Sequence, residues 1–292
     1  RRGETRGFAI PRPLPRAKGR GSPTRTVRPF DWRQTPGLSA FTAIIMLFFY
    51  APLLILVIYS FNANQLVTVW SGFSVHWFVD VAANADIRRA AINSVVIAIA
   101  ATIASMLIAT AGALALERGN LRRGRATVTA MIALPLIVPE IIVAIMTLIF
   151  FSMIGMHNGL VNLIIAHTVF CIPFALLPVQ ARLRDMGGTL DEAARDLYAN
   201  EWQLFRRVTL PLLMPAISAG ALMAFVVSLD DFLISLMVSG AGSTTLPVYV
   251  YGMMRLGVTP EVNAISTILL VVSLIFVTAS LLLGRRSQMA EQ

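Results

Sequence analysis

Charged residues are scarce in this sequence. They make up 13% of its 292 residues, whereas hydrophobic residues make up 57%. A typical soluble domain contains about 25% charged residues. So few polar side chains cannot cover a water-exposed protein of this size, and the composition excludes an ordinary soluble enzyme. It also excludes an intrinsically disordered or collagen-like chain.

Cysteine and lysine each occur once. With Cys171 alone, the chain can form neither an internal disulfide nor a multi-cysteine metal site. Lys18 follows Ala17, whereas a P-loop needs Gly-Lys-Ser/Thr, so this chain cannot itself hold ATP in a P-loop. The three histidines lack metal-site spacing and are expected to be structural. The sequence therefore does not indicate an enzyme.

Long uncharged segments dominate the chain. A membrane-spanning helix needs about 20 apolar residues, and strand-like alternation of apolar and polar residues is absent. We therefore expect an all-α integral membrane protein. Its six transmembrane helices are expected near residues 39–61, 91–116, 127–152, 158–180, 212–238 and 262–284.

The basic residues are distributed unevenly between the loops. Of the 24, 21 lie before residue 39, in the 117–126 and 181–211 loops, or after residue 284. The other three are Arg88, Arg89 and Arg255. The positive-inside rule then predicts that both termini and the 181–211 loop are cytoplasmic. A membrane explains the net charge of +9 better than a nucleic-acid partner does.

These features divide the chain into three parts. Residues 1–38 hold ten basic residues and six prolines, which predicts a flexible cytoplasmic tail. This tail could lie near anionic lipid headgroups or be an inert solvated extension. Residues 39–284 are expected to form the six-helix membrane domain, and residues 285–292 a cytoplasmic tail.

Three acidic residues, Glu140, Asp230 and Asp231, lie within predicted spans. A carboxylate in a bilayer costs several kcal/mol unless it faces a cavity or a partner. The fifth segment contains no basic residue, so these acids suggest a pathway for a cation with spaced amines. The alternative is that they only bond helix to helix. Since neighbouring helical residues point about 100° apart, one of Asp230 and Asp231 is expected to face the pathway and the other a neighbouring helix or loop.

Two tyrosines follow these acids in a predicted outer loop. Tyr249 and Tyr251 could contact amines through their rings, or could anchor the chain at the membrane interface.

The 181–211 loop is the longest predicted cytoplasmic loop. Its apolar residues recur at helical spacing and predict a short pair of amphipathic helices, with Thr189 or Asp191 as the first N-cap. Such a pair can dock a soluble partner or lie on lipid. The pattern alone leaves both alternatives open.

The same loop resembles the EAA loop of ABC importer permeases, E-A-A-x3-G-x9-I-x-L-P. Glu192–Ala194 supply the first three positions, and Val208 stands in place of Ile. Tyr198 replaces the glycine, which adopts a left-handed backbone in the family. In that conformation a tyrosine costs about 1 kcal/mol, so either Tyr198 is strained or the turn shifts toward Asn200. The resemblance assigns coupling to a separate ATPase subunit to Glu192, Ala193, Ala194, Asp196, Leu197, Tyr198, Leu210 and Pro211.

The resemblance continues through residues 228–232 and 240–267, which look like the spermidine/putrescine permeases of the C or I type. It covers roughly residues 40–284. It implies the type I importer permease fold, similar to the methionine and maltose importers, in the inner membrane. Two permeases, two ATPases and a periplasmic receptor form the working complex, with a different homologous chain as the second permease. ATP and magnesium bind the ATPases, so this chain itself holds no cofactor.

Other functions fit part of the sequence. Related permeases import opines, amino-acid derivatives or iron chelates, and the receptor usually selects the solute. A proton-coupled secondary transporter could use the same three acids, but the inverted repeat of many such transporters is not apparent. A membrane anchor without transport would not need acids inside its spans.

Overall fold

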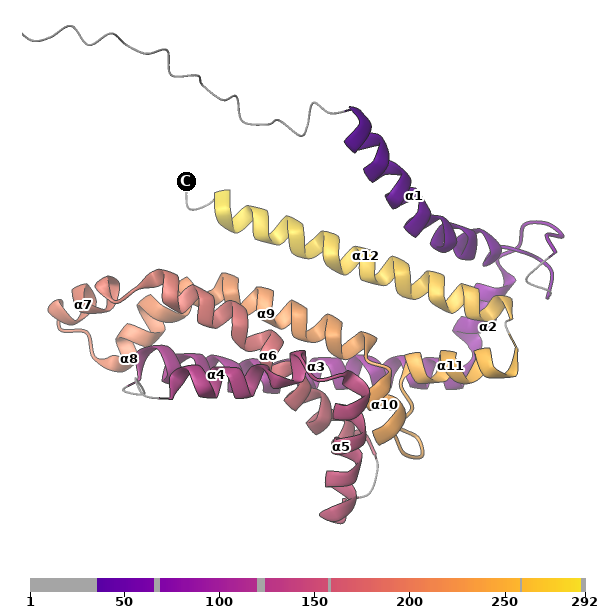
Figure 1. The fold of residues 1–292 in the computed structure, drawn as a ribbon. Coiled ribbons are helices and arrows are strands. Elements are labelled where there is room, and N and C mark those ends of the chain that lie inside the picture. Colours follow the sequence, from indigo (N-terminus) through magenta and orange to yellow (C-terminus); the bar gives the residue numbers. More distant parts are fainter. Residues whose placement is uncertain (1–35, 66–68, 120–123, 157–158, 258, 290–292) are drawn as a thin grey trace, which may run out of the picture. The chain divides into compact units, whose positions relative to one another are not determined.

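The structure is a computed structural model that describes residues 36–65, 69–119, 124–156, 159–257 and 259–289. Within these ranges every regular element is a helix, apart from one antiparallel bridge between Asn62 and Phe73 (Figure 1). The all-α prediction is therefore confirmed. Most of the predicted 1–38 tail, together with His157 and residues 120–123 and 290–292, lies outside the described residues.

The chain divides into two compact units, Arg1–Ala51 and Pro52–Gln292. The described part of the first unit is the beginning of α1 (Pro36–Tyr59). Residues Ser39–Tyr59 are long and apolar enough to cross a membrane, and none of the side chains in this span's apolar window is buried. Such a helix is suited to lipid or to a partner subunit.

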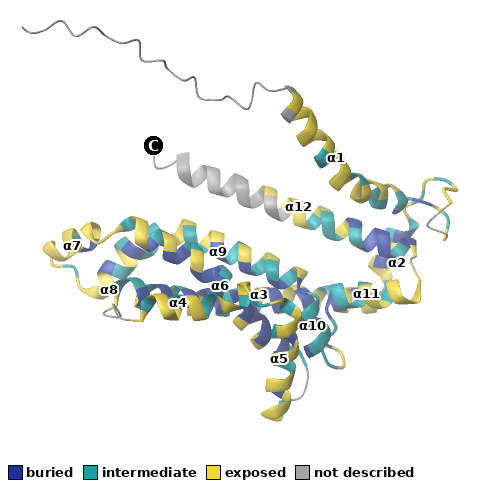
Figure 2. Ribbon diagram, in the orientation of Figure 1, coloured by how far each residue is buried: buried dark blue, intermediate teal, exposed yellow. Residues whose placement is uncertain are grey.

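Three long helices form the core of the second unit. They are α3 (Ala85–Arg118), α6 (Leu160–Met186) and α9 (Leu210–Asp230), and their facing sides are buried (Figure 2). Small residues such as Ala113 and Ala175 lie in this core. At Gly220 a Cβ atom would lie 2.9 Å from the carbonyl oxygen of Ala175, so the glycine lets α9 approach α6 closely.

The predicted third span is broken rather than continuous. It consists of α4 (Arg125–Ala133), the short helix η2 (Leu134–Leu136) and α5 (Glu140–Met153), and the two halves meet at 100°. Pro135 and Pro139 explain the break, because proline lacks a backbone N–H and clashes with the preceding turn. The segment predicted over 127–152 therefore contains two helices with a break at the prolines, instead of one continuous helix.

The fifth predicted span is also interrupted. It is formed by α9, which ends at Asp230, and α10 (Leu233–Val238). Two other helices extend beyond their predicted C-terminal ends. α6 continues to Met186, and α12 (Pro260–Met289) continues past the predicted end at residue 284. Among the described residues, four helices are long and apolar enough to span a membrane, or five if the bent pair counts as one span.

A second packed cluster joins α2 (His76–Ala83), α11 (Leu246–Leu256), α12 and the beginning of α3. Trp77 is buried there, and its Nε1 atom donates a hydrogen bond of 2.8 Å to the carbonyl of Asn62. The amide of Leu246 donates to Ser94 Oγ at 2.8 Å and fixes the start of α11 on α3. The segment expected to be an outer loop is therefore a docked helix.

Candidate functional site

Asp230 and Asp231 lie where α9 breaks. Asp230 is the last residue of α9, and Asp231 is extended, with φ −62° and ψ 126°. The expectation that the two side chains point about 100° apart assumed that both residues are helical. Asp231 is not helical, so that assumption does not hold. The two side chains nonetheless differ in environment, because Asp230 is exposed and Asp231 is 5% exposed.

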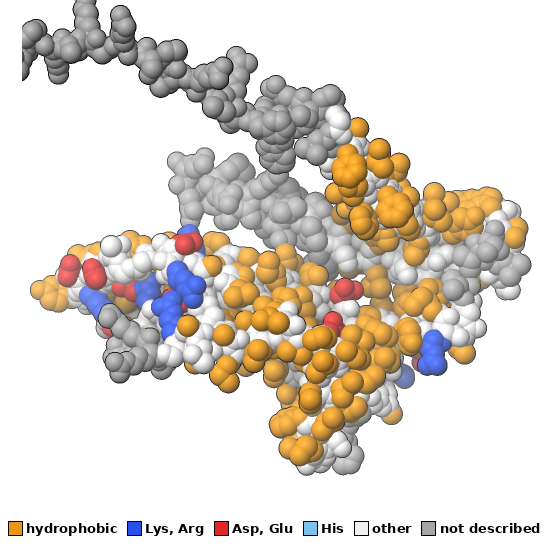
Figure 3. Space-filling model, in the orientation of Figure 1, with side chains coloured by type: hydrophobic (Ala, Val, Ile, Leu, Met, Phe, Trp, Pro, Cys, Tyr) orange, Lys and Arg blue, Asp and Glu red, His pale blue; other side chains and the backbone are white. Residues whose placement is uncertain are grey.

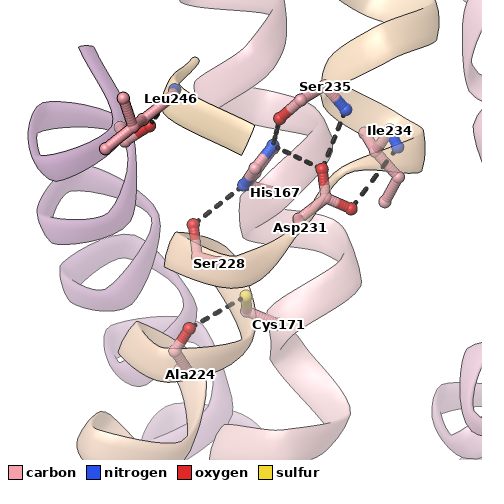
Figure 4. Close-up of polar contacts among 9 residues, drawn as sticks. His167, Cys171, Ala224, Ser228, Asp231, Ile234, Ser235 and Leu246 are labelled. Atoms are coloured by element: carbon pink, nitrogen blue, oxygen red, sulfur yellow. Dashed lines mark hydrogen bonds and ion pairs between the residues drawn. The ribbon is translucent and has the colours of Figure 1, made fainter. Parts of the chain in front are cut away.

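The Asp231 carboxylate stabilises the first turn of α10. It accepts hydrogen bonds from the amide of Ser235 at 2.8 Å and from the amide of Ile234 at 3.4 Å (Figure 4). These amides have no partner within the helix, because the first N–H groups of any helix lack one. Asp231 thus stabilises the start of α10.

His167 joins both sides of this break from α6. Its Nδ1 atom lies 2.8 Å from Ser228 Oγ in α9, and its Nε2 atom lies 3.2 Å from Ser235 Oγ in α10. Nε2 also lies 3.3 Å from Asp231 Oδ2, and the His167 side chain is 1% exposed. The expectation of a hydrogen-bonded structural histidine is confirmed, but one partner is an acid that was expected to lack a base nearby.

The sequence carried a signal for this cluster. Ser228, Asp231 and Ser235 are spaced by three and four residues, which places polar side chains on one side of a helical segment. The nearby base, His167, lies in α6 and not in the fifth segment, so the spacing within that segment does not indicate it.

Glu140 is the first residue of α5, directly after the proline break. Its carboxyl group is half-buried and close enough to Asp231 to interact with it, because α5 packs against α10. The structure thus brings all three predicted acids to the two helix breaks.

The two tyrosines have different surroundings. The ring of Tyr251 lies 4.8 Å from that of Phe232, beside the acids, and the guanidinium of Arg255 lies 6.0 Å from its centroid. Tyr249 instead packs against the cluster of α2, α11 and α12.

The predicted coupling loop forms two short helices, as expected. α7 (Thr189–Asp196) has Gly188 as its N-cap residue and no side-chain cap, so the prediction that Thr189 or Asp191 caps it was wrong. α8 (Glu201–Leu204) is capped by Asn200, whose Oδ1 accepts from the amide of Gln203 at 2.8 Å. The π-helical turn η3 (Phe205–Thr209) then leads into α9.

Tyr198 keeps the left-handed backbone of the glycine that it replaces. Its φ is +59°, and it is the one non-glycine residue with positive φ in the described part of the chain. The turn does not shift, because Asn200 has φ −76° and serves as the α8 cap. The Tyr198 side chain is 96% exposed and Leu197 is 82% exposed.

The residues assigned to coupling lie mostly on the surface. Glu192, Ala193, Asp196 and Pro211 are exposed, and Ala194 and Leu210 are half-buried. Figure 3 shows acidic and basic side chains gathered at the end of the second unit that holds α7 and α8, beside a largely hydrophobic surface. This end of the second unit is polar enough to lie in water.

Comparison with known proteins identifies the family. Residues 101–287 match the family described as the binding-protein-dependent transport system inner membrane component. The chain belongs to this family. It is 37% identical over 245 residues to the spermidine/putrescine transport system permease protein PotC of Escherichia coli K12, covering 84% of this chain and 92% of PotC. It is 38% identical to the putrescine transport system permease protein PotI of the same strain, covering 82% and 85%.

The fold agrees with that of a solved importer. The inward-facing MetNI methionine ABC transporter matches with a TM-score of 0.57 and 21% identity, over 68% of this chain and 95% of that chain. The likeness confirms the type I permease fold predicted from the sequence. The protein is an inner membrane transport component, and its curated relatives are permease proteins.

Proposed function

We propose that this chain is one permease subunit of an ATP-driven importer for a small cationic solute. The solute that we propose is a polyamine such as spermidine or putrescine. The identity of the chain to PotC and PotI over most of its length supports this substrate class. The gathering of Glu140, Asp230 and Asp231 at two helix breaks is the structural observation that carries the proposal. Carboxylates in a water-poor pathway lower the energy of an ammonium group that passes them.

The acids take different roles in this proposal. Asp230 is exposed at the end of α9 and faces the pathway, with Glu140 as a second acid along it. Asp231 is buried and holds α10 and His167 in place. Tyr251 flanks the pathway through its contact with Phe232, whereas Tyr249 stabilises the outer cluster.

The proposed topology has six spans with both termini in the cytoplasm. The spans are α1, α3, the bent α4–α5 pair, α6, α9 and α12, within residues 39–284. Residues 1–38 and 285–292 are then cytoplasmic tails. The concentration of arginine on one side supports this orientation.

The polar end formed by α7 and α8 is proposed to dock on a separate ATPase subunit. Glu192, Ala193 and the exposed Leu197–Tyr198 turn would contact that subunit, which binds ATP and magnesium. The complete importer would contain two ATPases, a second and different permease chain and a periplasmic receptor. This composition agrees with a binding-protein-dependent transport family.

Reconstitution tests the proposal. The chain is purified from its native membrane with co-eluting subunits and placed in liposomes that enclose ATP, with the co-encoded receptor outside. Uptake of labelled putrescine and spermidine that requires ATP and receptor is expected, and a neutral diol of similar length should neither enter nor compete. Uptake driven by a pH gradient without ATP would overturn the ATP-driven mechanism, and ATP-dependent uptake of an anionic solute alone would overturn the polyamine assignment.

A further inference from the structure

Two adjacent charged residues end α3 and contact different neighbours. The Glu117 carboxylate forms ion pairs with Arg125 at the start of α4 and with Arg184 near the end of α6, the latter at 2.9 Å. Its side chain is 4% exposed, which is rare for a glutamate unless it is paired. Glu117 therefore ties together the ends of three membrane helices.

Arg118, the next residue, points to the coupling loop. Its guanidinium forms an ion pair with the carboxylate of Asp191 in the first turn of α7. The two side chains are 22% and 12% exposed. Among the residues that the structure describes, this is the ion pair that links α7 to a membrane helix. The second ion pair of α7, Arg195–Glu201, stays within the loop and is 58% and 79% exposed.

α7 lies between two residues with positive φ. Gly187, directly after α6, has φ +61°, and the turn after α7 contains Tyr198 at φ +59°. α7 itself has eight residues, about two turns. α7 also packs against α8 and η3, so within the described residues the Arg118–Asp191 pair is its ionic link to the long helices.

We propose that the Arg118–Asp191 ion pair is a positioning pair that transmits movement of α7 to α3. The inference rests on the proposed function, in which α7 docks on an ATPase. A partly buried pair holds its geometry better than an exposed one, because water and salt screen it less. When the ATPase moves α7, Asp191 pulls on Arg118, and the Glu117 contacts carry the displacement to α4 and α6.

The test measures the number of solute molecules imported per ATP hydrolysed in the reconstituted complex. Asp191→Asn and Arg118→Gln are each expected to lower this ratio threefold or more, with receptor-stimulated ATP hydrolysis within twofold of wild type. The swapped variant Arg118→Asp/Asp191→Arg is expected to recover at least half of the wild-type ratio. Asp185→Asn, which removes an exposed carboxylate from the end of α6 outside α7 and α8, is the matched control and should not change the ratio.

The outcomes separate this inference from the proposed function. A wild-type complex without ATP-dependent uptake overturns the proposed function, whereas a working wild type with an unchanged ratio in Asp191→Asn overturns the positioning pair. Removing one partner of a partly buried pair can impair assembly. If the single variants do not assemble, Arg118→Lys keeps the charge but loses the forked guanidinium geometry. A smaller fall in the ratio is then expected, and a wild-type ratio would overturn the inference.

Discussion

The Nε2 atom of His167 lies 3.3 Å from Oδ2 of Asp231, and the same imidazole ring contacts Ser228 on one side of a helix break and Ser235 on the other. Asp231 therefore has a nearby base as well as two backbone hydrogen bonds. Asp231 can thus stabilise the helix break, whereas in the proposed function its exposed neighbour Asp230 attracts the solute.

Replacing Asp231 with alanine is expected to destabilise the protein. The change removes the acceptor for two buried amides, and each unpaired buried donor costs about 1–3 kcal/mol. The melting temperature of the detergent-solubilised protein should fall clearly. Asp230→Ala is the control, and its melting temperature should match the wild type because Asp230 is exposed. An equal fall in melting temperature in Asp231→Ala and Asp230→Ala would contradict a structural role for Asp231 that Asp230 does not share.

Replacing Asp230 with asparagine is expected to lower polyamine uptake tenfold or more, which corresponds to about 1.4 kcal/mol. Asparagine keeps the size of the side chain and its hydrogen bonding but removes the charge. Uptake is measured in the reconstituted complex after assembly has been checked by co-elution. Near-normal uptake would show that Asp230 does not attract the solute.

Replacing Gly220 with alanine is expected to destabilise the three-helix core. The added Cβ would lie 2.9 Å from the Ala175 carbonyl oxygen and 3.3 Å from Met106 Sδ, so a helix must shift. Gly252→Ala in α11 is the matched control, because nothing lies within 4 Å of its added Cβ. The control should be neutral or slightly stabilising, since alanine favours helix more than glycine. Thermal unfolding that ranks the two variants the other way would contradict the close approach of α9 to α6.

Cysteine labelling tests the orientation. The native Cys171 is fully buried, so Ala241→Cys and Thr189→Cys, both at exposed positions, can be compared in the natural background. We expect an impermeant thiol reagent to label position 241 from the periplasmic side of intact spheroplasts and to spare position 189. Position 243 is less suitable, because Ser243 is buried and bonded to Gly240. The reverse labelling pattern would overturn the proposed topology.

Replacing Tyr198 with glycine is expected to stabilise the turn after α7 by about 1 kcal/mol, because glycine adopts positive φ without strain. The amide of Ala199, which donates to the carbonyl of Ala194 at 3.1 Å, reports on this turn. Its hydrogen exchange should slow about fivefold. Tyr198→Val should speed exchange, since a β-branched residue tolerates positive φ poorly. Equal exchange rates of the Ala199 amide in Tyr198→Gly and Tyr198→Val would show that the backbone at position 198 is not strained.

The sequence predicted the positions of the helices well, because about 20 apolar residues in a row have few alternatives to a membrane span. It also predicted two short helices in the 181–211 loop, because the pattern that indicates them is local. It did not predict that two spans are broken. Prolines at 135 and 139 weaken a helix, but whether it kinks or turns by 100° depends on how α5 packs against α10.

Contacts between distant residues were missed for the same reason. His167 and Asp231 are 64 positions apart, and Arg118 and Asp191 are 73 apart, as their numbering shows. Periodicity and motif spacing report on neighbours along the chain, whereas these pairs exist only after α3, α6 and α9 have packed. Arg118 belongs to the arginines that predict the orientation, but the positive-inside pattern does not indicate which acid Arg118 contacts.

The break after Asp230 also exposes the backbone. The last four carbonyl groups of any α-helix have no amide partner within the helix, and they carry a partial charge equivalent to about −0.5. In α9 this end falls beside the exposed carboxylate of Asp230. In the proposed pathway, a passing cation would therefore meet main-chain carbonyl oxygens that no side-chain substitution can remove. An importer stripped of its acids should slow, yet still prefer a cation over an anion.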